Sequence, residues 1–376
     1  MEDGGMSAKR YLAPWARSAA AWRAAGAAVG GVALDAEALA ALEGKAAIYH
    51  CVSRAVWREK VFGAAEKEKF VRVLRKWEAF SGVRILTYCI MGNHFHVLVE
   101  VPERPEVAPT DGELLEKLGI IYGARKLAEI RWELEHFRSQ GNHAAAEALR
   151  QRFLRRMWDL SVFMKAVKQE LTVWWNRRKG KEGNLWQDKF KSVVVEEGHA
   201  ARVVAGYIDL NPVRAGLVKN AGAYRWSGWG EACAGGVRAR EGIVGVMVER
   251  ELGRAGPDVA AGAGADPEGA LAEYGALLAE DAGRRGGGVG AHAAEAERGE
   301  APKRKGAGRL TEAELLRRRV RYFVDGLVIG SGGFVEAVFE LSRGWFGAGR
   351  RSGARRLART DTPLRSIRGL RVRLYG

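Results

Sequence analysis

Apolar residues in the first half of the chain gather in short runs bounded by turn residues. The run over 47–52 (AIYHCV) predicts a strand. Two further runs, over 83–90 (VRILTYCI) and 94–101 (HFHVLVEV), are separated by the turn-forming residues 91–93. The spacing therefore predicts a hairpin formed by the second and third strands. A fourth strand is expected within the segment 183–195 (GNLWQDKFKSVVV).

Other segments carry apolar residues three and four positions apart, which is the repeat of an amphipathic helix. This spacing predicts helices over 66–80, 158–178 and 200–210. The last of these closes near Asn211, because Pro212 has no backbone N–H with which to continue a helix. Residues 104–156 read as a charged helical insertion.

Helices alternating with a few strands predict an α+β fold, with a small antiparallel sheet flanked by helices. We expect a separate, basic and mainly helical module at the C-terminal end. The predicted divisions are an Ala-rich extension at 1–45, a main domain at 46–230 with the insertion at 104–156, an acidic Gly/Ala-rich linker at 231–300, and the basic module at 301–376.

The charge of the 376-residue chain is unevenly distributed. The formal net charge is +16, which favours a polyanionic partner such as nucleic acid. Residues 301–376 hold eighteen Lys and Arg against six Asp and Glu, whereas residues 252–300 hold four against nine. We therefore expect a tethered DNA-binding module beyond an acidic linker that contains one short helix near 270–281.

Two helices are predicted in the C-terminal module, over 310–327 with Thr311 as N-cap and over 332–341 with Ser331 as a possible cap. Turn residues lie between them at 325–330. This order is compatible with a duplex-binding unit of the helix-turn-helix type. A basic tail that binds nucleic acid without specificity fits the same pattern equally well.

The cysteines and the longest uncharged stretches indicate the cellular setting. Cys51, Cys89 and Cys233 are odd in number and widely spaced, which suits reduced thiols. The longest uncharged run near the N-terminus, at 24–34, is too short to span a membrane. We expect a soluble bacterial protein of the cytoplasm, associated with the nucleoid, and monomer and homodimer both stay open.

His94 and His96 flank a phenylalanine on a predicted strand, so both imidazoles lie on one face of the sheet. Such a pair suits two ligands of one cation. A polar patch on the sheet explains an isolated pair about as well. Tyr207 and Asn211, one helical turn apart, share a face of the next candidate helix. Taken singly, a Tyr on a helix usually packs in the core, and an Asn before a Pro is usually a helix C-cap.

Several segments in one order resemble the single-tyrosine transposases, in particular their REP-associated branch. Asn93–His96 (NHFH) resembles the His–hydrophobe–His (HUH) motif, and Tyr207–Val218 (YIDLNPVRAGLV) resembles the tyrosine-helix signature. Tyr49–Arg54, Leu185–Phe190 and Tyr224–Trp229 are similar to flanking segments of the family. The likeness covers about 46–230.

The resemblance implies that Tyr207 is the nucleophile and that His94, His96 and Asn211 bind a divalent metal, Mg²⁺ or Mn²⁺. It implies cleavage and rejoining of single-stranded or hairpin DNA through a 5′-phosphotyrosine. No nucleotide-binding loop of the GxxxxGK[ST] type is present in the sequence. A relaxase-type nickase and a domesticated hairpin-binding regulator are the alternatives.

Residues near these motifs are candidates for holding DNA. Arg54, Lys189, Lys191 and Arg214 are plausible phosphate contacts, and Trp186 is a candidate for stacking on a base. Each also has an ordinary explanation, because a Trp usually packs in a core and a basic side chain usually faces solvent.

Overall fold

The structure of the chain is a computed structural model, and it describes residues 13, 46–56, 60–248, 266–283, 311–317, 322–357 and 360–367. The predicted extension at 1–45 lies outside the described residues apart from Ala13. Much of the predicted linker, at 249–265 and 284–300, also lies outside them.

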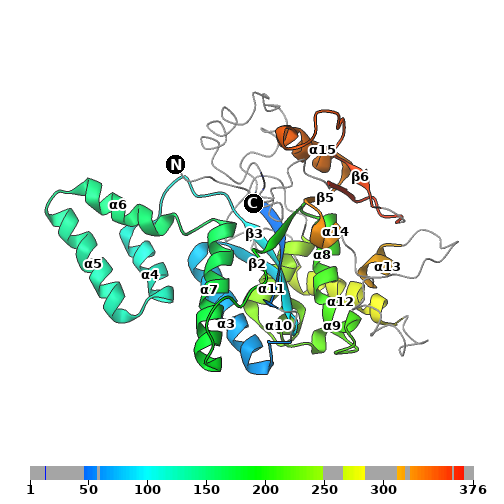
Figure 1. Ribbon diagram of the computed structural model, residues 1–376, viewed down its shortest axis with the longest axis horizontal. Coiled ribbons are helices and arrows are strands. Elements are labelled where there is room, and N and C mark those ends of the chain that lie inside the picture. Colours follow the sequence, from blue (N-terminus) through cyan, green and yellow to red (C-terminus); the bar gives the residue numbers. More distant parts are fainter. Residues whose placement is uncertain are drawn as a thin grey trace.

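One open sheet organises the molecule, with helices on both faces (Figure 1). Its order is β2-β3-β1-β4-β5-β7-β6. All neighbouring strands pair antiparallel except β4 and β5, which run parallel. The strands are β1 (Ala47–Arg54), β2 (Arg84–Ile90), β3 (His94–Val101), β4 (Lys191–Val195), β5 (Val328–Gly330), β6 (Arg355–Arg356) and β7 (Arg365–Ile367). The α+β prediction is confirmed.

The central strands are buried on both faces, because alternate side chains enter two separate cores. On one face, Phe95, Val97 and Val99 of β3 pack beneath α3 (Ala64–Ser81) and α7 (Leu160–Lys179). On the other face, Leu98 of β3 joins a second core. The predicted strands over 47–52, 83–90 and 94–101 and the predicted helices over 66–80 and 158–178 are all present.

The predicted insertion is helical, and it extends to one side of the sheet (Figure 1, left). Its helices are α4 (Asp111–Ile121), α5 (Ala124–Ser139) and α6 (His143–Leu154). Leu118, Ile130, Leu134 and Phe153 are buried among them. The insertion therefore has apolar contacts of its own, and α4 also packs on α3.

The second face of the sheet carries the helix that ends in Tyr207-Ile208-Asp209. This helix, α8 (His199–Asp209), packs on β2 and β3. It is followed by α9 (Asn211–Arg214), η3 (Ala221–Ala223), α10 (Gly228–Cys233), α11 (Val237–Met247) and α12 (Pro267–Gly283). The predicted helix near 270–281 is therefore present as α12. However, α11 packs on β2 and α12 packs on α11, so this part of the expected linker is folded against the domain.

The C-terminal segment, residues 311–367, differs most from expectation. It contains α13 (Glu312–Arg317), α14 (Tyr322–Asp325), β5, α15 (Gly332–Leu341), η5 (Arg343–Trp345), β6 and β7. The predicted turn at 325–330 contains strand β5, whose residues Val328 and Ile329 pair with Val194 and Val195 of β4. The described part is therefore an extension of the main sheet, not a separate module, and its two predicted helices do not form a helix-turn-helix. The physical reason is that β4 would otherwise be an unpaired edge.

Both predicted helix caps in this segment are confirmed. The Ser331 hydroxyl accepts a hydrogen bond from the backbone N–H of Phe334, 3.2 Å away. Thr311 and Glu314 form a reciprocal pair of bonds at the start of α13. No helix within the described ranges is both long and apolar enough to cross a membrane.

Candidate active site

His94 and His96 lie on one face of β3, as their spacing predicts. Their ring centroids are 5.2 Å apart. His96 is 3% exposed, whereas His94 at the strand's beginning is half-buried. Burial is the main cause that holds the pKa of His96 well below its usual range. His96 is therefore a neutral ring at physiological pH.

A third histidine, His50 of β1, completes this group. It is fully buried, and burial lowers its pKa to about 4. Its Nδ1 lies 2.6 Å from the carbonyl oxygen of Phe323, and its Nε2 lies 2.9 Å from Nδ1 of His96. Because a carbonyl can only accept, His50 must donate from Nδ1 and accept at Nε2. The proton on His96 is therefore on Nδ1, and its lone pair is on Nε2.

The same tautomer is imposed on His94 by its neighbour in the chain. Nδ1 of His94 lies 2.7 Å from the side-chain oxygen of Asn93. An amide oxygen accepts, so His94 carries a proton on Nδ1, and in the neutral ring the lone pair is then on Nε2. A hydrogen bond that fixes the tautomer of a ligating imidazole is the usual second layer of a metal site.

The donor set can therefore be tested for its fit to a metal. Two imidazoles on one face of the strand, each using Nδ1 in a hydrogen bond, fit a divalent cation bound through Nε2. Across the residues that the structure describes, no three His, Cys, Asp or Glu side chains form a metal-binding group. A cation at His94 and His96 would thus take its remaining ligands from other oxygen donors.

Tyr207 of α8 lies beside the histidines. Its ring centroid is 6.1 Å from that of His96 and 6.3 Å from that of His50. Phe323 of the C-terminal segment packs edge-on against the same ring at 4.9 Å, and Tyr207 is only 2% exposed. The structure therefore brings the predicted nucleophile and the predicted histidine pair together.

Asn211 acts on the end of the tyrosine helix. Its amide nitrogen donates to the carbonyl oxygens of Tyr207 (3.2 Å) and Ile208 (3.1 Å). The Ile208 carbonyl needs such a donor, because the residue four positions later is Pro212, which has no N–H. The Asn211 side-chain oxygen is the atom that a metal would take. Its role as third ligand stays a prediction.

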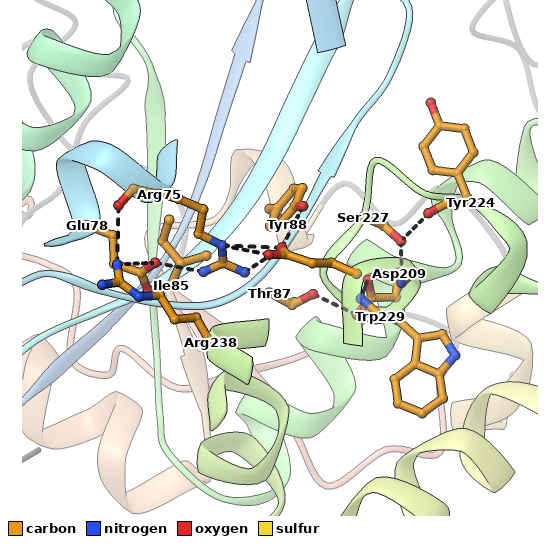
Figure 2. Close-up of polar contacts among 12 residues, drawn as sticks. Arg75, Glu78, Ile85, Thr87, Tyr88, Asp209, Tyr224, Ser227, Trp229 and Arg238 are labelled. Carbon is orange, nitrogen blue, oxygen red and sulfur yellow. Dashed lines mark hydrogen bonds and ion pairs between the residues drawn. The ribbon is translucent and has the colours of Figure 1, made fainter. Parts of the chain in front are cut away.

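Asp209 anchors the same end of α8 and was not singled out by the sequence. Its fully buried carboxylate accepts hydrogen bonds from Thr87 Oγ1 (2.8 Å), Tyr274 Oη (2.7 Å) and the backbone N–H of Trp229 (3.1 Å). Figure 2 shows Thr87 and Trp229 beside it. Burial raises the pKa of Asp209 to about 6 despite these bonds. The carboxylate thereby joins the tyrosine helix to β2, α10 and α12.

Two of the predicted DNA contacts lie on the face that carries the histidines. In the strand register, Val52 of β1 is opposite both His96 and Lys191, so Lys191 points to the same side of the sheet. Arg54 is opposite His94. Both basic residues are partly exposed. Both therefore share the face of the histidine pair, and their contact with a phosphate stays a prediction.

The other candidates are distributed differently. Lys189 is exposed. Trp186 is 3% exposed, packs against Phe62, Phe70 and Phe95, and donates its indole N–H to Thr172 at 3.0 Å. Its ring belongs to the core, so the stacking role is not available to it in this structure.

Arg214, the last of the predicted DNA contacts, lies over the ring of Tyr207, with its guanidinium carbon 4.2 Å from the centroid. It also donates to two backbone carbonyls.

Two residues that the sequence did not single out, besides Asp209, left different signals. His50 interrupts the apolar run 47–52, and a histidine inside a buried strand needs a partner. That partner, His96, lies on another strand, which the run itself does not reveal. Phe323 left no signal, because its contact with Tyr207 joins positions more than a hundred residues apart.

Comparison with known proteins supports the resemblance for one part of the chain. Residues 45–111 match the family model of the IS200-like transposases. This stretch contains β1, β2 and β3, with His50, His94 and His96. The predicted likeness to a transposase family is confirmed there.

A solved structure described as a REP-associated tyrosine transposase bound to a REP hairpin is also similar. The likeness covers 52% of this chain and 82% of that one, at 15% identity and a TM-score of 0.32. Among curated protein sequences, none matches the chain.

Proposed function

We propose that this protein is a metal-dependent tyrosine transposase that cleaves and rejoins single-stranded or hairpin DNA. The observation that carries this proposal is the packing of Tyr207 against the His50–His96 pair, within a region whose β1–β3 core matches a transposase family. Tyr207 and these histidines come from segments more than a hundred residues apart, so their packing against one another supports a shared site.

The chemistry follows from the residues present. Attack by the Tyr207 oxygen on a backbone phosphorus forms the O–P bond and breaks the bond from phosphorus to the 3′ oxygen. The phenol loses one proton and the released 3′ oxygen gains one, so no external energy source is required. A divalent cation bound by His94 and His96, with Asn211 as the proposed third ligand, would polarise the phosphate and stabilise the transition-state charge.

Basic side chains around the site fit a nucleic-acid substrate. We propose that Arg54 and Lys191 contact phosphates next to the scissile one, because both lie on the histidine-bearing face. The hairpin form of the substrate is supported by the hairpin bound to the similar solved protein. Lys189, which is exposed, is a further proposed contact.

The direct test is covalent capture of DNA. A 3′-labelled single strand should become attached to the wild-type protein and migrate with it in a denaturing gel, whereas a 5′-labelled strand should be released. Tyr207→Phe should abolish the adduct while DNA affinity stays within about threefold, because the ring that packs in the core is retained. Tyr122→Phe, in the insertion, is the matched control and should form the adduct normally.

The same assay tests whether the reaction requires a divalent metal. Adduct formation should require Mg²⁺ or Mn²⁺, stop in excess chelator, and be lost in the His94→Ala, His96→Ala double variant. Binding without any adduct in Mg²⁺ or Mn²⁺ would favour the alternative of a non-cleaving regulator. An adduct that persists in Tyr207→Phe would contradict the assignment of the nucleophile.

A further inference from the structure

The side chain of Arg214 is engaged by the nucleophile's own helix. One guanidinium nitrogen donates to the carbonyl oxygen of Tyr207 at 2.6 Å, and the other donates to the carbonyl oxygen of Leu316 in α13, also at 2.6 Å. The guanidinium carbon lies 4.2 Å from the centroid of the Tyr207 ring. One side chain thus binds the backbone of Tyr207, covers its ring and joins α9 to the C-terminal segment.

This arrangement depends on the planar fork of an arginine. A guanidinium donates along fixed directions in its plane and can stack on an aromatic face at the same time, which an ammonium group cannot do. A cation at the C-terminal end of a helix also complements the helix dipole. At this end of α8 the carbonyl oxygen of Tyr207 accepts from two side chains, Asn211 and Arg214. Carbonyls at a helix end often take such side-chain donors.

The neighbours of Tyr207 show what the contact does to its ring. Phe323 packs edge-on on the ring, and His50 and His96 lie near it. Arg214 lies over a face of the ring. With these groups in place the phenol has little freedom to tilt. A fixed nucleophile needs less ordering in the transition state, and a displacement of about 1 Å can cost about 100-fold in rate.

We propose that Arg214 is a positioning residue for the nucleophile, rather than the phosphate contact that its charge and location in the sequence suggest. This inference rests on the proposed function, because it assigns Tyr207 the attack on DNA. Its consequence is that Arg214 controls the rate of adduct formation and contributes little to DNA affinity.

The experiment compares Arg214→Gln with wild type in single-turnover capture of a 3′-labelled strand. We expect the rate at saturating DNA to fall about 10- to 100-fold, with Kd and its salt dependence unchanged. Arg214→Lys, which keeps the charge but loses the fork, should recover little of the rate. Millimolar guanidinium should partly restore Arg214→Ala. Arg225→Gln is the matched control, because Arg225 also lies over an aromatic ring, that of Trp226, and pairs with Glu68.

A phosphate contact would give the opposite pattern: a weaker Kd, a salt slope lower by about one and a normal rate at saturation. That pattern, or a wild-type rate in Arg214→Gln, would overturn the inference. Thermal melting of each variant separates these results from loss of the fold, and Arg214→Lys serves if Arg214→Gln does not fold.

A second readout does not depend on activity. In protein labelled with 3-fluorotyrosine, the resonance of Tyr207 is identified by its absence from Tyr207→Phe. In Arg214→Gln that signal should shift and broaden, while the signals of the other eight tyrosines stay in place. An unchanged Tyr207 signal would contradict the proposal, even if wild type forms no adduct and the proposed function itself fails.

Discussion

The central strands β1–β3 and the C-terminal segment 311–367 belong to the same sheet, but the sequence predicted their places in the fold unequally well. In β1–β3, the periodicity of a few neighbouring residues predicted the three strands, the hairpin of β2 and β3, and the shared face of His94 and His96. In the C-terminal segment, a surplus of arginines predicted a separate DNA-binding module. The structure instead places β5 beside β4 and Phe323 against Tyr207.

The difference shows what net charge reports. Arginines such as Arg355 and Arg356 of β6 are exposed and set the charge of the segment, but they do not set its place in the fold. That place is set by a smaller number of buried apolar residues, including Val328, Ile329 and Phe339. Charge is therefore evidence about partners, and burial is evidence about architecture.

The largest expected effect tests whether the two regions are one cooperative unit. Phe323→Ala and Phe70→Ala each remove a ring that is 0% exposed, one from the C-terminal segment and one from the central region. Each should lower the free energy of unfolding by about 3–5 kcal/mol. Denaturant unfolding followed by Trp fluorescence should show a single transition for both variants.

A tethered module would give a different result. In that case Phe323→Ala would leave the main transition within about 1 kcal/mol of wild type, or would split it into two. Either outcome would show that the two regions unfold independently.

The next effect concerns acid. His50, which holds the Phe323 carbonyl, has a folded pKa of about 4 against an ordinary value of 6.5. The unfolded chain therefore binds more protons between these values, and stability from this group is lost as the pH falls from about 6.5 to 4. Asp209 has a folded pKa of about 6 against 3.8. The folded chain binds more protons there, so this group lowers stability as the pH rises. Across the whole interval between the folded and the ordinary pKa, each group changes the free energy of unfolding by about 3 kcal/mol.

These opposite slopes should largely cancel in the wild type, so variants expose them. Asp209→Asn should make stability rise more steeply with pH between 4.5 and 6.5. His50→Gln should flatten or reverse the slope. Denaturant midpoints at three pH values measure both, and identical slopes in all three proteins would contradict the assignment.

The smallest expected effect concerns a helix cap. Ser331 caps α15 and also donates from its hydroxyl to Glu196, directly after β4, at 2.9 Å. Ser331→Ala should cost about 1–2 kcal/mol, and Thr110→Ala, which caps α4 in the insertion, about 1 kcal/mol. If Ser331→Ala costs no more than Thr110→Ala in denaturant titrations, the bond to Glu196 does not help to join the two regions.

Much of the candidate site was predictable because its residues repeat at local periods. His94 and His96 share a face through the two-residue repeat of a strand, and Tyr207 and Asn211 share one through the turn of a helix. The contact of His50 with His96 could not be predicted without the antiparallel register of β1 with β3, which sets His50 diagonally from His96. The orientations of Trp186 and Arg214 depend on which side chains surround them, so residue type alone gave Trp186 a role that its burial excludes.

By itself the sequence determined the α+β class, the strands and helices of 46–210, the insertion and the chemistry-bearing motifs, since each depends on contacts between neighbours in the chain. The tertiary structure decided that the C-terminal segment completes the sheet and that Phe323 holds His50 and covers Tyr207. It also decided that Arg214 lies on the ring of Tyr207. Such contacts join residues whose separation in the chain carries no periodic signal. They form because an open strand edge, a buried imidazole and the free carbonyls at a helix end each require a partner.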